Sequence, residues 1–352
     1  MESGTIEHAL PGLEIDVPRT EVSVGRALPL TPQKRLTVFS GRSHPELAAR
    51  MAHQLGVELG DVELETFANG ETYCRYNESI RGADVFIVQT GCKPVDRNLI
   101  ELLMMIQAAK LASAKRITAV IPWFPYSRQD RKAKPREPIS ARLVADMLQL
   151  AGADRVLTMD LHAGQIQGFF TVPVDHMTAL PLFARHFRDV GLAGEGVVSV
   201  SPDAGRAKLA LRFAEMIGAD FAIMHKTRPA HDQVEITEVT GRVHGKVAIV
   251  GDDVTTTGST QIAGAATLRE HGATAVWMFV THSLLDGDTL ERVAEAKDIT
   301  GIVVTDTVPI DPRRRPSNMT VLSVSGLLAE TIMNVFADDS VSAIFGGENQ
   351  LF

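Results

Sequence analysis

The sequence is most informative between residues 247 and 260, which read Val247-Ala-Ile-Val-Gly-Asp-Asp-Val-Thr-Thr-Thr-Gly-Ser-Thr260. An apolar run leads into two adjacent acids, Asp252 and Asp253, then into a turn rich in hydroxyl groups and glycine, and then into a segment with helical periodicity. A buried strand that passes through such a turn into a helix is the repeating unit of α/β proteins. The free N–H groups at the start of that helix are suited to bind phosphate.

The rest of the chain repeats this alternation. Short β-branched runs predict buried strands at Leu36–Phe39, Val85–Gln89, Ile117–Phe124, Val156–Leu161, Val197–Val200, Phe221–Met224, Val247–Val250, Ala275–Val280 and Ile302–Thr305. Apolar residues at helical spacing predict helices at Leu99–Ala112, Ala141–Leu150, Ala207–Ile217, Ile262–His271 and Leu327–Phe336. The pattern therefore predicts an α/β protein with mainly parallel sheets flanked by helices.

The length of 352 residues and the number of strands favour two α/β domains. Residues 1–34 lack a sustained period and predict a mobile tail. The turn-rich approach to Ala179 and Pro181 marks a boundary near residue 180, so that 35–180 form the first domain. Gln233–Gly241 alternates only partly and predicts a hairpin or flap instead of a crossover.

Composition excludes several classes of protein. The formal charge is 35 − 43 = −8, so nothing global attracts nucleic acid or an anionic membrane. The two cysteines, Cys74 and Cys92, form neither a disulfide framework nor a zinc motif. Neither a signal peptide nor an apolar run of membrane-spanning length is present, which predicts a cytoplasmic protein without membrane or nucleic-acid partners.

The stretch 247–260 also suggests a ligand. Thr257, Ser259, Thr260 and nearby amides can donate to a phosphate, while the two acids can accept from sugar hydroxyls, as a phosphorylated sugar requires. The alternative is a helix-capping turn with two solvated acids.

These residues resemble the phosphoribosyl diphosphate (PRPP) binding motif shared by phosphoribosyltransferases and ribose-phosphate diphosphokinases. The chain departs from the usual motif at Thr255, which replaces an apolar residue, at Thr256, which replaces a third Asp, and at Ser259, which replaces a Gly. The resemblance implies that ribose 5-phosphate is bound by Asp252, Asp253, Thr255, Thr256, Thr257, Gly258, Ser259 and Thr260.

Further segments between residues 35 and 350 resemble the ribose-phosphate diphosphokinase (PRPP synthetase) family. They are Phe67-Ala-Asn-Gly-Glu71, Glu78-Ser-Ile-Arg-Gly82, Pro125-Tyr-Ser-Arg-Gln-Asp-Arg-Lys132, Asp160-Leu-His-Ala163, Gln165-Ile-Gln-Gly-Phe-Phe170, Val200-Ser-Pro-Asp203 and His225-Lys-Thr-Arg-Pro229. The family implies two phosphoribosyltransferase-like domains, the second at 181–326, and a segment 327–352 that packs back on the first. It also implies transfer of the diphosphoryl group of ATP to ribose 5-phosphate, giving PRPP and AMP.

The same resemblance implies roles on the nucleotide side. Arg128 and Gln129 would contact ATP, and His162 would lie near ATP and, with Asp203, support Mg²⁺ as cofactor. The alternatives are a solvated charge run and a capping or core-satisfied histidine. The stretch with Phe67, Asn69 and Glu71 resembles one that reaches the adenine pocket of a neighbouring subunit. A tight Asn-Gly turn explains Asn69 equally well.

Two further sites are implied. Lys226 and Arg228 resemble the cations of a catalytic loop that closes over the transferring group, with an ordinary basic surface loop as the alternative. Arg81, Ser340 and Ser342 resemble parts of a second anion site, between subunits, that carries phosphate activation and ADP inhibition in a hexamer built from dimers. Helix capping by Ser340 is the alternative there.

Three functional hypotheses follow. The first is an active ribose-phosphate diphosphokinase, a transferase of nucleotide biosynthesis. The second is a catalytically weak homologue that assembles with an active paralogue and regulates it. Thr256 favours this hypothesis, and it is opposed by intact Arg128, His162, Lys226 and Arg228. The third, a phosphoribosyltransferase, fits poorly because such enzymes have one domain and lack the Arg-Gln-Asp stretch.

Overall fold

The computed structural model describes residues 34–230 and 233–342, with 226–237 described as backbone only. The predicted mobile tail at 1–34 thus lies almost entirely outside the described residues. From Arg35 onward the chain belongs to one compact unit.

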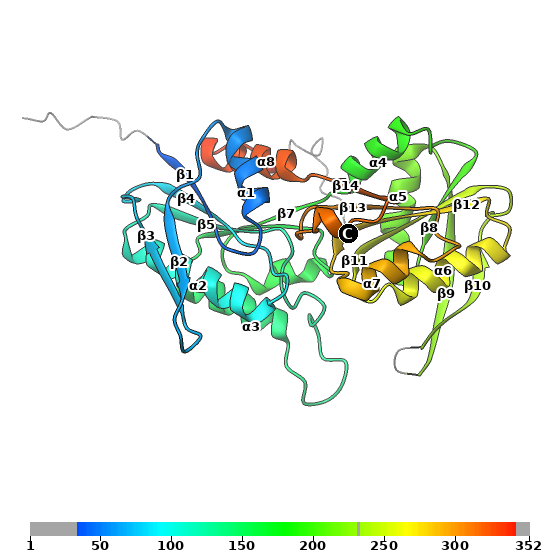
Figure 1. Ribbon diagram of the computed structural model, residues 1–352, viewed down its shortest axis with the longest axis horizontal. Coiled ribbons are helices and arrows are strands. Elements are labelled where there is room, and N and C mark those ends of the chain that lie inside the picture. Colours follow the sequence, from blue (N-terminus) through cyan, green and yellow to red (C-terminus); the bar gives the residue numbers. More distant parts are fainter. Residues whose placement is uncertain (1–33, 231–232, 343–352) are drawn as a thin grey trace, which may run out of the picture. The chain divides into compact units, whose positions relative to one another are not determined.

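Two mainly parallel sheets organise this unit, as Figure 1 shows. The first is wholly parallel and has the order β1 (Leu36–Ser40), β4 (Asp84–Val88), β5 (Arg116–Ile121), β6 (Arg155–Met159), β7 (Val174–Met177). The second has the order β10 (Gln233–Thr240), β9 (Asp220–Ala230), β8 (Val197–Ser201), β11 (Val247–Thr255), β12 (Ala275–Ser283), β13 (Gly301–Thr305), β14 (Met319–Leu322). Only β10 runs antiparallel to its neighbour. A separate antiparallel hairpin joins β2 (Val62–Thr66) to β3 (Thr72–Tyr76).

Helices cover both faces of each sheet (Figure 1). On the first sheet, α2 (Val95–Leu111) and α3 (Ser140–Ala151) lie opposite α1 (Pro45–Leu55) and α8 (Ser325–Ala337). On the second, α6 (Ser259–Glu270) and α7 (Gly287–Ala294) lie opposite α4 (Leu180–Asp189) and α5 (Ala207–Ile217). This explains the continuous apolar strands, because a strand covered on both faces has no solvent side. The predicted α/β class with helix-flanked parallel sheets is confirmed.

One hydrophobic core is shared by the two sheets. It includes Phe86 of the first sheet, Phe279 of the second and Phe183 of α4. The rings of Phe183 and Phe279 have centroids 4.7 Å apart. The boundary predicted near residue 180 falls on the first residue of α4, and the division at 180 and 326 stays a prediction.

The helix α8 returns to the first sheet. It contacts α1, where Gln54 Nε2 donates to Ser325 Oγ at 3.1 Å, and Arg116 of β5 donates to Asp338 just beyond α8 at 2.6 Å. The last residues of the chain, 343–352, lie outside the described part.

Three predicted boundaries need correction. The strand predicted to end at Phe124 ends at Ile121, because Pro122 has no N–H for the ladder, and the strand predicted to end at Leu161 ends at Met159. The predicted hairpin exists, but β9 continues to Ala230, so Lys226 and Arg228 lie within a strand and not in a loop after it.

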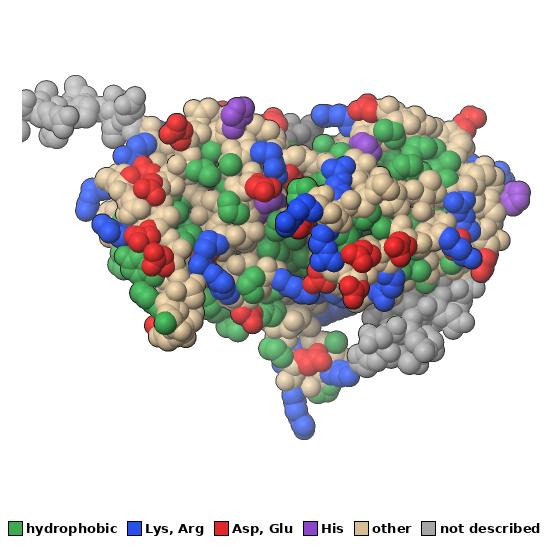
Figure 2. Space-filling model, in the orientation of Figure 1, with side chains coloured by type: hydrophobic (Ala, Val, Ile, Leu, Met, Phe, Trp, Pro, Cys, Tyr) green, Lys and Arg blue, Asp and Glu red, His purple; other side chains and the backbone are tan. Residues whose placement is uncertain are grey.

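Charged side chains of both signs are interspersed over the face that Figure 2 shows. Within the described residues, no helix combines the length and apolar character needed to cross a membrane.

Candidate active site

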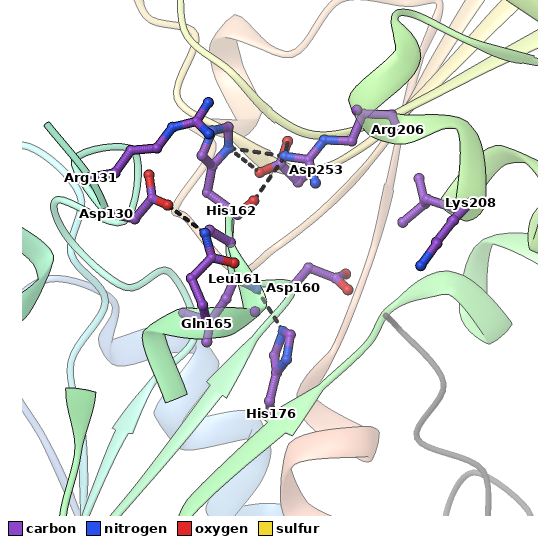
Figure 3. Close-up of a pocket in the computed structure, with 14 residues that line it drawn as sticks. Asp130, Arg131, Asp160, Leu161, His162, Gln165, His176, Arg206, Lys208 and Asp253 are labelled. Carbon is purple, nitrogen blue, oxygen red and sulfur yellow. Dashed lines mark hydrogen bonds and ion pairs between the residues drawn. The ribbon is translucent and has the colours of Figure 1, made fainter. Parts of the chain in front are cut away.

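The two sheets meet at the carboxyl ends of β6 and β11, the edge at which α/β proteins bind ligands. His162 follows β6, and Asp253 lies near the end of β11. Nδ1 of His162 is 2.7 Å from Oδ2 of Asp253, so side chains 91 positions apart form one contact (Figure 3). The structure therefore brings together His162 and Asp253, two residues predicted from the sequence to belong to the site.

Arg206, at the end of the short helix η2 (Ala204–Arg206), completes this cluster. Its Nη2 lies 2.5 Å from Asp253 Oδ1, an ion pair without hydrogen-bond geometry, and 3.0 Å from His162 Nδ1. Its Nε lies 3.6 Å from Asp252 Oδ1. Arg206 has no role predicted from the sequence, although it follows the segment Val200–Asp203 that resembles the family.

The two adjacent acids differ electrostatically. Burial opposes ionisation of Asp253, but the hydrogen bond with His162 and the charge of Arg206 outweigh it and lower its pKa to about 2. Burial and the neighbouring charge of Asp253 raise the pKa of Asp252 above its usual value. Asp253 is only 3% exposed, whereas Asp252 is 19% exposed. Asp252 is therefore the more exposed of the two carboxyl groups.

A buried polar layer supports the chain before His162. Asp160 has a left-handed φ of 35°, and its Oδ2 accepts from the Ala179 amide at 3.0 Å and from Thr281 Oγ1 at 2.7 Å. His176 Nε2 accepts from the Leu161 amide at 2.8 Å. Burial lowers the pKa of His176 to about 4, and His282 adds to this effect. The charge of Asp160 acts in the opposite direction but does not outweigh burial. His176 is therefore neutral at physiological pH and accepts this hydrogen bond.

A cavity of about 450 Å³ opens beside this cluster, and we call it the His162 pocket. It is lined by Asp130, Arg131, Asp160, Leu161, His162, Ala163, Gly164, Gln165, His176, Gly205, Arg206, Lys208, Leu209 and Asp253. Figure 3 shows Asp130 and Arg131 to one side of His162, Lys208 to the other, and Gln165 below it. Gln165 Nε2 donates to Asp130 Oδ2 at 2.7 Å. Sequence reasoning gave no role to the polar residues Arg131, Gln165, His176 and Lys208.

The turn of the predicted PRPP motif, residues 256–258, joins β11 to α6, and we call it the motif loop. A turn between a strand and a helix was predicted here. Thr255 is buried and donates to Gln261 at 3.1 Å, while Thr256 Oγ1 accepts from Arg128 Nη1 at 3.4 Å. Gly258 has a φ of 70°, and a Cβ there would lie 1.9 Å from Val293 of α7. Ser259 is the first residue of α6 and its amide approaches Thr257 Oγ1 at 3.5 Å.

Arg128 and Gln129 follow β5 but differ in their partners. Arg128 is exposed and reaches Thr256 across the junction of the two sheets. The side-chain oxygen of Gln129 accepts from Ser140 Oγ at 2.6 Å, at the start of α3. The side-chain amide of Gln129 therefore already has one hydrogen-bond partner within the fold.

The two side chains predicted to hold Mg²⁺, His162 and Asp203, both have partners within the fold. Asp203 Oδ1 accepts from the Gly205 amide at 2.9 Å and caps η2. His162 Nδ1 lies 2.7 Å from Asp253 Oδ2 and 3.0 Å from Arg206 Nη2, so this nitrogen has partners within the fold and a metal would have to be held by Nε2. Among the described residues, no three His, Cys, Asp or Glu side chains gather as metal ligands would. Their role as ligands stays a prediction.

Phe67, Asn69 and Glu71 form the tip of the β2–β3 hairpin and do not line the His162 pocket. Asn69 Oδ1 accepts from the Glu71 amide at 3.2 Å, as a tight turn requires. Phe67 and Glu71 line a second cavity of about 480 Å³ with Asp96, Arg97, Ile100 and Met104 of α2.

The remaining predicted residues lie elsewhere. Lys226 and Arg228 belong to β9, where Lys226 pairs with Ile236 of β10, and their side chains are outside the description. Arg81 donates to Ser113 Oγ at 3.3 Å. Ser340 and Ser342 are 2.8 Å apart between their hydroxyl oxygens, after α8 has ended.

Comparison with known proteins extends over most of the chain. Residues 36–152 match the model of the N-terminal domain of ribose phosphate pyrophosphokinase, and residues 224–346 match that of the phosphoribosyl synthetase-associated domain.

Curated relatives carry the same name. A ribose-phosphate pyrophosphokinase of Caldanaerobacter subterraneus is 47% identical over 310 residues, covering 88% of this chain and 98% of that protein. Ribose-phosphate pyrophosphokinase 2 of Schizosaccharomyces pombe is 45% identical over 312 residues, covering 88% and 97%. The crystal structure of phosphoribosylpyrophosphate synthetase from Mycobacterium smegmatis matches with a TM-score of 0.80 at 45% identity, over 87% of this chain and 100% of that one.

Proposed function

This chain belongs to the ribose-phosphate pyrophosphokinase family, and from that membership we propose that it converts ATP and ribose 5-phosphate into PRPP and AMP. The 1-hydroxyl oxygen of the sugar attacks the β-phosphorus of ATP and loses its proton. The bond from that phosphorus to the α-phosphate oxygen breaks, and AMP leaves. The protein forms no covalent intermediate, so its task is positioning and charge stabilisation.

The observation that carries the proposal is the pair of contacts across the junction of the sheets. Arg128, on the nucleotide side, reaches Thr256 of the motif loop at 3.4 Å, and His162 reaches Asp253 at 2.7 Å. Direct transfer requires donor and acceptor to lie side by side, because orientation supplies much of the rate. Two separate binding sites would not need these contacts.

On the sugar side, we assign the 5-phosphate to the loop before α6. The amides at the start of α6 and the hydroxyls of Thr257, Ser259 and Thr260 are suitable donors. Of the two acids, Asp252 is the one assigned to a sugar hydroxyl, because it is the more exposed. Asp253 has its Oδ2 against His162 and its Oδ1 against Arg206.

On the nucleotide side, Arg128, Gln129 and His162 are assigned to ATP. Lys226 and Arg228 lie on the β9–β10 hairpin, and we propose that they neutralise the charge that develops on the leaving AMP. Mg²⁺ is proposed to enter with ATP as part of the substrate, where it neutralises the phosphate oxygens.

Assembly and regulation complete the proposal. The hairpin tip with Phe67, Asn69 and Glu71 is assigned to the adenine pocket of a neighbouring copy, in a homohexamer built from dimers. Arg81, Ser340 and Ser342 are assigned to an anion site for phosphate and ADP. The cytoplasmic location stays a prediction from the sequence.

The test is AMP formation from ATP and Mg²⁺, measured with and without ribose 5-phosphate. AMP and PRPP should appear in equal amounts, and only when the sugar phosphate is present. Formation of ADP, or of AMP without the sugar phosphate, would contradict the proposal. A chain that makes neither product would support the regulatory reading instead.

A further inference from the structure

Arg206 occupies an unusual place for a cation. It ends η2, directly after β8, and only 17% of its side chain is exposed. A guanidinium removed from water is costly unless charged or polar partners surround it. The partners of Arg206 are the acids of the motif and the histidine beside them.

Its contacts converge on the acidic pair. Nη2 lies 2.5 Å from Asp253 Oδ1 and 3.3 Å from the His162 carbonyl oxygen (Figure 3). Nε lies 3.6 Å from Asp252 Oδ1. The guanidinium therefore faces one oxygen of each acid at the centre of the site.

Two adjacent carboxylates at a strand end are the ligands that Mg²⁺ prefers. Here Asp253 presents one oxygen to Arg206 and the other to His162. A divalent ion between the acids would meet a fixed positive charge within a few ångströms, and like charges repel strongly where water is excluded. Thr256, which replaces the third acid of the usual motif, removes a further negative charge.

We propose that Arg206 is a fixed positioning cation that takes the place of a divalent metal ion at Asp252 and Asp253. It joins His162 after β6 to Asp253 of β11 and holds both sides of the site together without a metal. The chain alone then binds divalent ions weakly, and the ion arrives with the nucleotide. The inference rests on the proposed function only for the identity of that nucleotide.

The test is binding of Mn²⁺, a paramagnetic substitute for Mg²⁺, to the full chain, followed by electron paramagnetic resonance without nucleotide. Arg206→Gln should bind the ion at least about tenfold more tightly than the parent, because one positive charge is removed beside two acids. Arg206→Lys restores the charge and should return to the parent's weak binding. Lys208→Gln is the matched control, since Lys208 lines the same pocket but, among the described residues, forms no ion pair with either acid.

Equal Mn²⁺ affinity of the parent and Arg206→Gln would overturn the proposal. A tenfold gain in Lys208→Gln would also overturn it, because general charge in the pocket would then be the cause. A second measurement needs no variant: the parent should bind Mn²⁺ well only when ATP is added, and tight binding of one ion per chain without ATP contradicts the inference. None of these readouts requires turnover, so a chain that fails to make PRPP would refute the proposed function alone.

Discussion

Asp252 and Asp253 are neighbours of the same residue type, yet the fold separates their properties. Asp253 contacts His162 with Oδ2 and Arg206 with Oδ1. Asp252 has its Oδ1 3.6 Å from Arg206 Nε, and its Oδ2 accepts from Gln261 of α6 at 3.5 Å. From the sequence, both acids are expected to be sugar ligands. Nothing in the sequence distinguishes them, because the difference depends on side chains 47 and 91 positions away.

Thr256 is the clearest departure from the family motif, and Thr256→Asp should raise kcat/KM for ribose 5-phosphate by about tenfold. The new carboxylate would accept a charge-assisted hydrogen bond from a sugar hydroxyl, which is worth roughly 1.5–3 kcal/mol. The measurement is AMP formation at varied ribose 5-phosphate. Thr256→Asn, similar in shape but uncharged, is the control and should stay near the parent. An Asn variant that gains as much as Asp would show that charge is not the cause.

His176 predicts a pH dependence of stability. Its folded pKa of about 4 lies below the value of about 6.5 in the unfolded chain, so the unfolded chain binds the proton first as pH falls. The contribution is complete above pH 6.5 and is lost between pH 6.5 and 4, at most about 3 kcal/mol. In urea unfolding, His176→Gln should lose less stability across this window than the parent.

The exposed His53 of α1 supplies the control for that experiment. His53→Gln should retain the parent's full fall in the free energy of unfolding. Identical pH profiles for His176→Gln and the parent would contradict the assignment of this slope to His176.

At the scale of elements, the motif loop depends on a glycine. Gly258→Ala should destabilise the protein by about 2–5 kcal/mol. This is the sum of the backbone strain of an alanine at a left-handed φ and the steric clash of its Cβ with Val293. Gly56, at the end of α1, has a similar φ of 68° but nothing within 4 Å of its Cβ position. Gly56→Ala should therefore cost only about 1–2 kcal/mol.

Urea unfolding of both variants measures this difference, and the KM for ribose 5-phosphate reports on the loop. We expect a raised KM for Gly258→Ala only. Equal losses of stability in the two variants would mean that α7 does not constrain the loop.

Elements with strong β-branched runs were predictable, whereas polar or very short ones were not. All nine predicted strands exist, but β2, β3, β7 and β14 were not predicted. In β7 (Val174–Met177), Asp175 and His176 interrupt the apolar pattern. Those two side chains are satisfied by Arg155 at 2.8 Å and by the Leu161 amide, contacts that a sequence does not reveal. Pro181 was interpreted as a boundary, although it stands in the first turn of α4, where proline is favoured.

At the scale of the whole described unit, α8 links the end of the second sheet to α1 of the first. Ile332 is fully buried in the shared core, while the next residue, Met333, is 43% exposed. Ile332→Ala should lower the free energy of unfolding by about 2–5 kcal/mol, and Met333→Ala by about 0.5 kcal/mol or less. Equal effects in chemical unfolding would contradict the packing of α8 into the core.

The candidate site could be predicted in its segments but not in its connections. The motif loop, Arg128 and His162 were identified from the chain, and the structure brings all three to the junction of the sheets. Arg206 was not identified, because a lone arginine after a strand has no pattern that separates it from a solvated surface residue. Its importance comes from three partners that only the folded chain assembles.

The central claim is direct transfer of an intact diphosphoryl group between substrates bound side by side at this junction. The most direct measurement uses ATP labelled in its β-phosphate and follows the label after reaction with ribose 5-phosphate and Mg²⁺. For direct transfer, we expect all transferred label in PRPP, with unlabelled AMP and no labelled ADP or free diphosphate. Label in ADP or in free diphosphate as the primary product would contradict it.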